Sequence, residues 1–436
     1  MKTILPALTC LAIIAPNLLA ADKPAKPNLV FILSDDHGLD GVGCYGSDRF
    51  QGRTPNMDAL ASSGIRFENA YCTPLCGPTR CLLNTGRYGF RTGGTNNQNA
   101  REPASKDEPS LARTLKQAGY ATGMAGKWRQ MGESPGEWGF EEFITDPTAA
   151  GWYWKSNYTK NGKLVETDKE VYCPDVNLEF ARDFFRRHKD EPFYFYFPSH
   201  LVHGPILRTP ATKPGTTGAE ALYDDNIAYL DKQIGELVAE LDKLGLREKT
   251  LVVFSADNGT ARQSGTLGGR QINGQKSTML EGGAHVPFIA NWKGVTPAGK
   301  VLKDLVDFSD LFPTFAELAG AKMPAGVKFD GRSFVPQLRG EKGNPREWIF
   351  VQLGARWYAR NAGWKLNQAG DLFDLSDAPF AEKLVAASGQ SDTAKTARKQ
   401  LQAVLDELNP AAGKNPVSQD PAAKKAKRKA RRAANQ

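Results

Sequence analysis

The sequence has no long hydrophobic run beyond its first twenty residues. The N-terminal stretch MKTILPALTCLAIIAPNLLA combines the basic residue Lys2 with a short apolar run and the small residue Ala20. This pattern is typical of a secretory signal over residues 1–21 that is cut before Ala21 or Asp22. No later segment approaches the about eighteen apolar residues of a membrane span, so we expect no transmembrane segment and an exported protein, periplasmic or secreted.

Cysteine is also scarce. Of the six cysteines, Cys10 lies in the predicted signal, and the mature chain keeps an odd number: Cys44, Cys72, Cys76, Cys81 and Cys173. An odd number leaves at least one thiol without an intramolecular partner. Three of them fall in CTPLCGPTRC, residues 72–81, without the paired Cys-x2-Cys units of a zinc knot. A disulfide from Cys72 to Cys81 or Cys173, and one chemically special cysteine, are the alternatives that remain.

Acidic residues are missing from the C-terminal stretch AKKAKRKARRAANQ, residues 423–436, which carries seven basic residues. The formal net charge of the chain is +8, and without those seven it would be +1. The body is therefore nearly neutral, and we expect no nucleic-acid partner. Residues 411–436 are predicted to form a disordered basic tail, with an anchor for an anionic polymer or membrane surface as the alternative.

Short apolar runs alternate with helical patterns along the body. The runs NLVFIL, FYFYF and TLVVF, at 28–33, 193–197 and 250–254, are typical of buried strands. Segments with helical periodicity lie between and around them, at 56–64, 110–119 and 222–245. Such alternation predicts an α/β fold, with a mostly parallel central sheet that helices flank on both faces.

The pattern changes near residue 345. Residues 346–377 contain short strand-like runs with tight turns at Gly354, Ala362-Gly363 and Ala369-Gly370, and a helical stretch follows at about 392–408. We therefore expect a large domain over 22–340 and a small α+β C-terminal subdomain over 341–410.

Polar side chains follow the predicted strands where each strand ends. Asp35 and Asp36 follow the first strand, and Asp257 and Asn258 follow the third. Ligands bind beyond the carboxyl ends of parallel strands, and carboxylate and amide oxygens suit a hard divalent cation. These four residues are predicted metal ligands, for calcium in preference to magnesium.

Cys76 differs from its neighbours by its position. Pro78 suits the first turn of a helix and Gly86 suits its end, which places Cys76 at a helix N-terminus. The free N–H groups there favour an anion or a thiolate.

Six segments in order resemble the formylglycine-dependent sulfatases of the alkaline phosphatase-like superfamily. Cys76-Gly77-Pro78-Thr79-Arg80 with Leu83-Asn84-Thr85-Gly86-Arg87 resembles the C-x-P-x-R signature and its TGR-like continuation. The other matching segments are Ser34–Gly38, Gly126-Lys127-Trp128, His203-Gly204-Pro205, Ser255–Gly259, and Lys276 with Glu281-Gly282-Gly283. The resemblance runs from about residue 28 to 375 and implies an alkaline phosphatase-like fold.

The resemblance also implies the chemistry. A maturation enzyme would oxidise Cys76 to formylglycine, whose hydrate attacks sulfur and later expels sulfate by collapsing to the aldehyde. Arg80 would hold that hydrate, Lys127 and Lys276 would stabilise charge on the sulfate oxygens, and His203 would protonate the leaving alcohol.

Arg129 departs from the family pattern, which usually has histidine two residues after the GKW lysine. Arginine cannot serve as a base, so Arg129 is predicted to be a charge clamp among the catalytic residues. His37 and His200 are the candidate substitutes for the missing base, and His285 is interpreted as structural.

The predicted function is an exported sulfatase that acts on sulfated carbohydrate. The alternatives are a phosphonate or phosphate ester hydrolase of the same superfamily and an inactive sulfated-glycan binder. The aromatic run Gly151-Trp152-Tyr153-Trp154 either stacks sugar rings or plugs the core.

Overall fold

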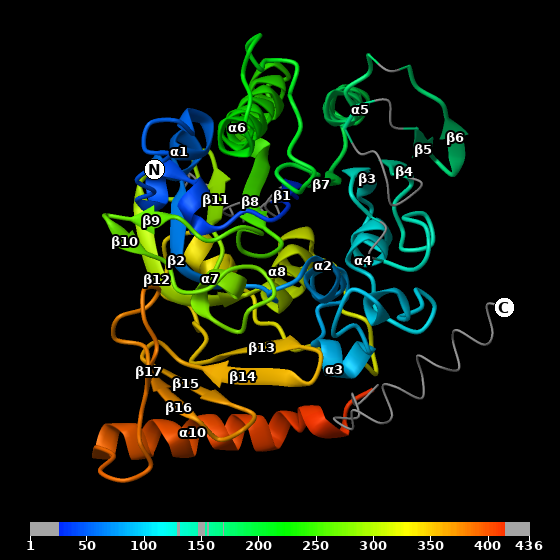
Figure 1. Ribbon diagram of the computed structural model, residues 1–436. Coiled ribbons are helices and arrows are strands. Elements are labelled where there is room, and N and C mark those ends of the chain that lie inside the picture. Colours follow the sequence, from blue (N-terminus) through cyan, green and yellow to red (C-terminus); the bar gives the residue numbers. More distant parts are fainter. Residues whose placement is uncertain (1–25, 129–130, 147–152, 155–156, 169, 415–436) are drawn as a thin grey trace, which may run out of the picture.

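The computed structural model describes residues 26–128, 131–146, 153–154, 157–168 and 170–414. Its centre is a ten-stranded sheet in which β1 lies between two parallel neighbours, β8 and β7 (Figure 1). In sheet order the strands are β12 (Lys300–Asp307), β2 (Ile65–Tyr71), β11 (Phe288–Trp292), β8 (Thr250–Ala256), β1 (Asn28–Ser34), β7 (Phe193–Pro198), β3 (Ala121–Gly126), β4 (Glu142–Thr145), β5 (Tyr158–Lys160) and β6 (Lys163–Val165).

Helices cover both faces of this sheet, and its central strands β1, β7 and β8 are buried at every position. Leu29, Phe31 and Leu33 of β1 face one hydrophobic cluster, and Val30 and Ile32 face the other. On the upper side of Figure 1 lie α1 (Pro55–Ser62), α5 (Cys173–Arg187) and α6 (Ala219–Lys243). On the other side lie α2 (Cys76–Thr85), α4 (Leu111–Gln117) and α8 (Leu311–Ala319). The predicted mostly parallel α/β fold is confirmed, and the three helical segments predicted within the body correspond to α1, α4 and α6.

The smaller elements surround this core. They are the helices α3 (Gly89–Thr92), α7 (Glu281–Ala284) and α9 (Val335–Leu338) and the hairpin β9 (Thr266–Leu267) and β10 (Arg270–Gln271). No helix among the described residues is both long and apolar enough to cross a bilayer.

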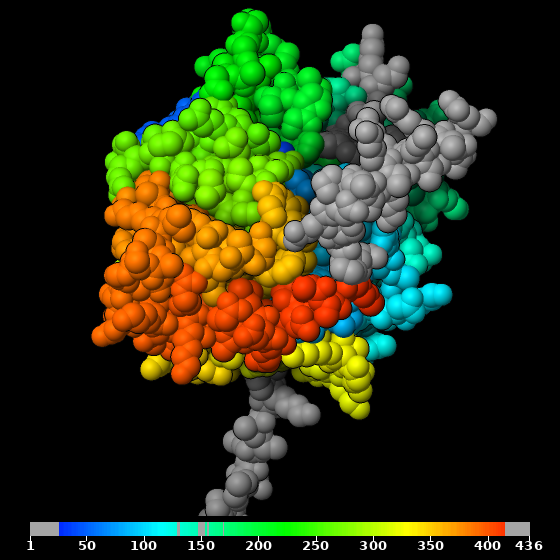
Figure 2. Space-filling view, turned by 60° about the horizontal axis from the view of Figure 1, so that its bottom comes forward, coloured from blue at the N-terminus to red at the C-terminus, as the bar shows by residue number. Residues whose placement is uncertain are grey.

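The C-terminal part forms a second, antiparallel sheet with a helix below it (Figure 1). Its elements are β13 (Ile349–Leu353), β14 (Arg356–Arg360), β15 (Trp364–Asn367), β16 (Leu372–Asp374), β17 (Lys383–Leu384) and α10 (Asp392–Leu408). In the space-filling view the orange C-terminal residues adjoin the lime-green segment that precedes α7 (Figure 2). The turns predicted at Gly354, Ala362-Gly363 and Ala369-Gly370 all separate strands of this sheet.

Both predicted terminal segments extend beyond the described residues. The signal over 1–21 lies wholly outside them. Of the tail predicted from residue 411, the first residues contact the body: Lys414 donates from its backbone N–H to Phe90 O at 2.7 Å and from Nζ to Glu108 Oε1 at 2.9 Å. The remainder of the tail lies outside the described range.

Candidate active site

Two paired strand ends bring the predicted metal ligands together. In the register of β1 and β8, Ser34 is opposite Ala256, so Asp35 and Asp36 emerge beside Asp257 and Asn258. Asp36 has a φ of 57°, a left-handed conformation that is uncommon outside glycine. Its backbone N–H donates to Asp257 Oδ1 at 3.2 Å, which holds the two strand ends together.

Cys76 is the first residue of α2, as the sequence predicted, and its side chain is buried against the acids. Its Sγ lies 3.5 Å from Asp35 Oδ1 and 3.8 Å from Asp36 Oδ1. Glycine at the next position leaves room for Asn97, because a Cβ at Gly77 would lie 2.6 Å from Asn97 Oδ1, which accepts the Gly77 N–H. Asn97 was not identified from the sequence, where no motif singles it out.

The expectation that this helix end favours a thiolate is wrong. Burial and the Asp257 carboxylate raise the pKa of the Cys76 thiol well above its ordinary value, and Asp35 and Asp36 act in the same direction. Lys127 opposes them but does not compensate. Burial and the surrounding acids therefore outweigh the helix N-terminus, and they disfavour the thiolate form of Cys76.

Three cations each face one of the three acids. The Arg80 guanidinium donates to Asp257 Oδ2 from Nε at 3.0 Å and from Nη2 at 2.7 Å. Lys127 forms an ion pair with Asp35. Lys276 Nζ lies 2.5 Å from Asp36 Oδ1. The six side chains therefore form three pairs of opposite charge.

Lys127 reaches this position because β3 ends at a glycine. Gly126 has a φ of 130°, and a Cβ there would lie 2.0 Å from the carbonyl oxygen of Pro198. The Lys127 N–H donates to that same carbonyl at 2.7 Å. Burial raises the pKa of the partner, Asp35, but Lys127 and then His203 lower it further, and the net value is about 2. Asp35 is therefore a carboxylate at working pH.

His203 completes the cluster from the loop after β7. Its Nε2 lies 3.6 Å from Asp36 Oδ2, and its Nδ1 lies 2.6 Å from the Gly204 carbonyl oxygen, to which Nδ1–H donates. Ligand atoms from Asp35, Asp36, Cys76 and His203 all lie within 4.8 Å of one another. Tyr153 Oη donates to the carbonyl oxygens of His203 and His200, at 2.6 and 2.9 Å, and so supports the loop.

The oxygen donors of the site fit a hard cation. Asn258 donates from Nδ2 to Asp36 Oδ1 at 2.8 Å, while its Oδ1 is buried without a hydrogen-bond partner. A buried carbonyl oxygen without a partner is costly, and a cation ligand is the role that would satisfy it. With the carboxylates of Asp35, Asp36 and Asp257, all buried, it forms an oxygen set typical of calcium or magnesium.

The candidate substitutes for the missing base have other partners. His37 is buried, its Nδ1 lies 3.1 Å from Ser34 Oγ, and burial lowers its pKa to about 4. His200 Nε2 lies 3.1 Å from Asp146 Oδ1, and burial lowers its pKa as well. His285 bonds Glu68 O and stacks on Tyr71 with ring centroids 4.6 Å apart, in agreement with a structural role. Arg129 lies outside the described residues.

The disulfide alternative is not supported. All five cysteines of the described range are free thiols, and Cys72 donates to backbone carbonyls while Cys81 contacts Thr92 Oγ1 at 3.5 Å. The aromatic residues 152–154 differ in their positions. Trp152 is outside the described residues, Tyr153 is buried as a plug, and Trp154 lines an open hollow of about 540 Å³ with Leu207 and Arg208.

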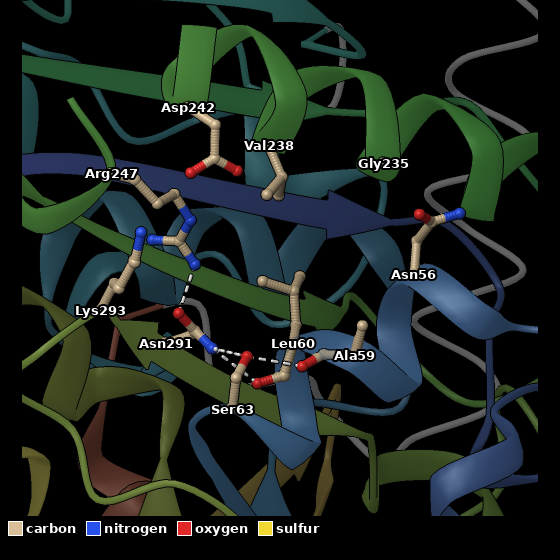
Figure 3. A pocket seen from close by; sticks show the side chains of 10 residues that line it. All are labelled: Asn56, Ala59, Leu60, Ser63, Gly235, Val238, Asp242, Arg247, Asn291 and Lys293. Atoms are coloured by element: carbon tan, nitrogen blue, oxygen red, sulfur yellow. Dashed lines mark hydrogen bonds between the residues drawn. The ribbon is translucent and has the colours of Figure 1, made fainter. Parts of the chain in front are cut away.

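A separate hollow of about 340 Å³ lies at the opposite edge of the sheet (Figure 3). Arg247 at its rim precedes β8, whereas Asp257 follows the same strand. The Arg247 guanidinium donates to Thr250 O at 3.3 Å and to Asn291 Oδ1. Asn291 in turn donates to Leu60 O and Ser63 Oγ, at 2.8 Å each. None of the predicted site residues lines this hollow.

Comparison with known proteins decides the family. The family model described as Sulfatase matches residues 27–321, which is more than half of the chain. The chain belongs to the sulfatase family.

Curated relatives agree with this assignment. Human arylsulfatase A is 32% identical over 370 residues, covering 76% of this sulfatase and 71% of the relative. Canine N-acetylgalactosamine-6-sulfatase is 32% identical over 368 residues, covering 76% and 69%. The sulfatase is therefore a sulfuric ester hydrolase.

Solved structures agree with the fold. The crystal structure of Ps i-CgsB in complex with k-i-k-neocarrahexaose superposes with a TM-score of 0.76 at 27% identity, covering 90% of this chain and 94% of the other. The PsFucS1 sulfatase from Pseudoalteromonas sp. superposes with a TM-score of 0.73 at 25% identity, covering 89% and 92%. The sulfatase thus has the predicted alkaline phosphatase-like architecture.

Proposed function

We propose that this sulfatase is exported and removes sulfate from a sulfated carbohydrate, with formylglycine at position 76 and a calcium ion. The observation that carries the proposal is the buried arrangement of Cys76 among three acids and three cations. The structurally similar protein Ps i-CgsB was solved in complex with k-i-k-neocarrahexaose, which supports a carbohydrate substrate for this chain.

The charges of the site suit a sulfate ester. Three carboxylates face three cationic side chains, so their formal charges cancel. Calcium held by Asp35, Asp36, Asp257 and Asn258 would add the net positive charge that attracts the anionic ester. Lys127 and Lys276 reach the cluster from different loops, and both would stabilise negative charge on the sulfate oxygens.

Cys76 supplies the nucleophile only after oxidation. The hydrated aldehyde of formylglycine would supply an oxygen nucleophile that can release sulfate afterwards. The Arg80 guanidinium is committed to Asp257 and to the Lys127 carbonyl, so it orients a metal ligand in addition to its predicted contact with the hydrate. A formylglycine-generating maturation enzyme is the partner that this chemistry requires.

His203 is the proposed proton donor to the leaving alcohol. Because Nδ1–H is bonded to the Gly204 carbonyl, Nε2 is the nitrogen that can exchange a proton with the substrate. Nε2 also faces the acid cluster through Asp36, on the side where the ester must bind. Arg129 is proposed as a fixed cation at the flank of the substrate, because a guanidinium can only donate hydrogen bonds.

Parallel assays test this function. Enzyme produced in a host that can mature Cys76 should hydrolyse an aryl sulfate and release sulfate from defined sulfated oligosaccharides. An aryl phosphonate tests the alternative within the superfamily, and preferred turnover of that compound would contradict the proposal. Binding of sulfated oligosaccharide without turnover, in protein with formylglycine verified by mass spectrometry, would favour the inactive binder.

The basic tail is proposed to contact anionic polymer outside the cell. Deleting residues 421–436 should leave turnover of a small aryl sulfate unchanged and weaken retention on an anionic column. Equal retention of both proteins over a salt gradient would rule out the anchor and leave a solvated tail.

A further inference from the structure

The loop that carries Lys276 lies between the catalytic body and the C-terminal sheet. On the side of the body, Lys276 N–H donates to Thr260 O at 2.9 Å, and Ser277 N–H donates to Pro74 O at 2.7 Å. Pro74 is two residues before Cys76. These two bonds place the Lys276 backbone beside the nucleophile, from where its side chain reaches Asp36.

On its other side the same loop is held by the C-terminal sheet. Four of its backbone groups pair with β14, β15 and the connection between β16 and β17. The pairs are Asn273 N–H with Pro379 O (2.9 Å), Ser277 O with Arg356 Nη2 (3.3 Å), Met279 O with Lys365 Nζ (3.2 Å) and Glu281 N–H with Glu382 Oε1 (3.0 Å).

Lys365 and Glu382 form a buried ion pair at the centre of this contact. Their side chains are only 4% and 2% exposed. A buried ion pair is weak support for stability, because desolvation of both charges offsets their attraction. Each member of this pair also bonds one backbone group of the loop. The main effect of the pair is therefore to fix the backbone of residues 279–281, and not to stabilise the fold.

The loop needs such support because its conformation is unfavourable locally. Ser277 has a φ of 69°, in the left-handed region that is unfavourable for a residue other than glycine. Its N–H bonds the body and its carbonyl bonds Arg356, so both faces of this residue are restrained. Loss of contacts on the side of the C-terminal sheet would let the loop relax and would displace Lys276.

We propose that Lys365 and Glu382 are positioning residues that hold Lys276 in place for sulfate hydrolysis. The C-terminal sheet is then part of the catalytic apparatus, although neither residue touches the predicted nucleophile. The proposal rests on the proposed role of Lys276 in binding the sulfate group.

A double-mutant cycle tests the proposal on an aryl sulfate. Lys365→Met removes the donor to Met279 O, and Lys365→Met/Glu382→Gln does so without leaving a buried unpaired carboxylate. The Gln side chain can still accept from the Glu281 N–H. Both variants should lower kcat/KM by about tenfold, because small displacements of catalytic groups cost about 10- to 100-fold. In a Lys276→Ala background the same changes should cost less than about twofold.

A matched control separates positioning from general destabilisation. Arg247→Met also removes a buried cation that donates to a backbone carbonyl, but at the opposite edge of the sheet (Figure 3). It should lower Tm while leaving kcat of the folded enzyme unchanged in both backgrounds.

Two outcomes would overturn the proposal, and they differ from each other. If the Lys365 variants lower kcat/KM by the same factor with and without Lys276→Ala, the positioning role is refuted and the proposed function stays intact. A Lys276→Ala enzyme with normal kcat/KM would refute the proposed role of Lys276, and the positioning proposal with it.

Discussion

Replacing Asn258 by leucine tests the calcium site through stability as well as activity. The substitution keeps a similar volume and removes Oδ1, the buried oxygen without a hydrogen-bond partner. It also removes the Nδ2 hydrogen bonds to Asp36 Oδ1 and Gly259 O, each 2.8 Å long. We therefore expect two separable effects: a loss of stability that does not depend on calcium, and a loss of calcium affinity.

The expected magnitudes are set by linkage between binding and folding. At free calcium about a thousandfold above Kd, binding stabilises the native protein by about 4 kcal/mol. If the variant binds about a hundredfold more weakly, the same concentration is about tenfold above its Kd and stabilises it by about 1.4 kcal/mol. The rise in Tm on adding calcium should therefore fall to about one third of that in the original protein.

Thermal unfolding with chelator and with calcium measures both effects. Asn291→Leu is the matched control, because Asn291 is equally buried and its amide bonds Leu60 O and Ser63 Oγ at the opposite edge of the sheet (Figure 3). This control should lower Tm equally in both conditions and keep the full calcium-induced rise. A full rise in Asn258→Leu would refute the assignment of Asn258 as a ligand.

Three further outcomes are expected. Cys76→Ala should abolish turnover with little change in Tm, and mass spectrometry of active enzyme should find formylglycine at 76; an intact thiol in fully active protein would contradict the chemistry. Arg360→Met should destabilise the fold by about 3–5 kcal/mol at neutral pH, because it leaves the buried Glu281 carboxylate without its cation. Burial raises the pKa of Glu281, but Arg360 and His285 lower it below its ordinary value. The Arg360–Glu281 pair therefore stabilises the folded protein fully above about pH 4.3, and this contribution is lost as the pH falls further and Glu281 becomes protonated. The gap in Tm between the two proteins should narrow in acid, and a constant gap would argue against the pair. Trp154→Ala should raise KM for a sulfated oligosaccharide and spare a small aryl sulfate, whereas equal effects on both would leave Trp154 as packing only.

Much of the site could be predicted from the sequence because its residues lie at the ends of recognisable strands. The runs ending at Ser34 and Ala256 are buried throughout, and parallel neighbours must present the residues after their carboxyl ends at one edge of the sheet. Pro78 and Gly86 likewise predicted both ends of α2, where Gly86 adopts the left-handed cap with a φ of 65°. Periodicity and local backbone preferences were sufficient for these features.

Pairing between distant side chains was decided only by the tertiary structure. Lys127 meets Asp35 across 92 residues, and Arg80 meets Asp257 across 177, through a strand order that local patterns do not encode. The raised pKa of Cys76 arises from burial and from acids on other strands, so its helix position alone predicted the wrong direction.

The sequence by itself determined the three central strands β1, β7 and β8, the helix that begins at Cys76 and the order of the family segments, because each depends on residues close together in the chain. Only the tertiary structure decided that the five described cysteines are free and that Lys365 and Glu382 bond the loop that carries Lys276. Those contacts join two sheets, and their geometry depends on how the sheets pack.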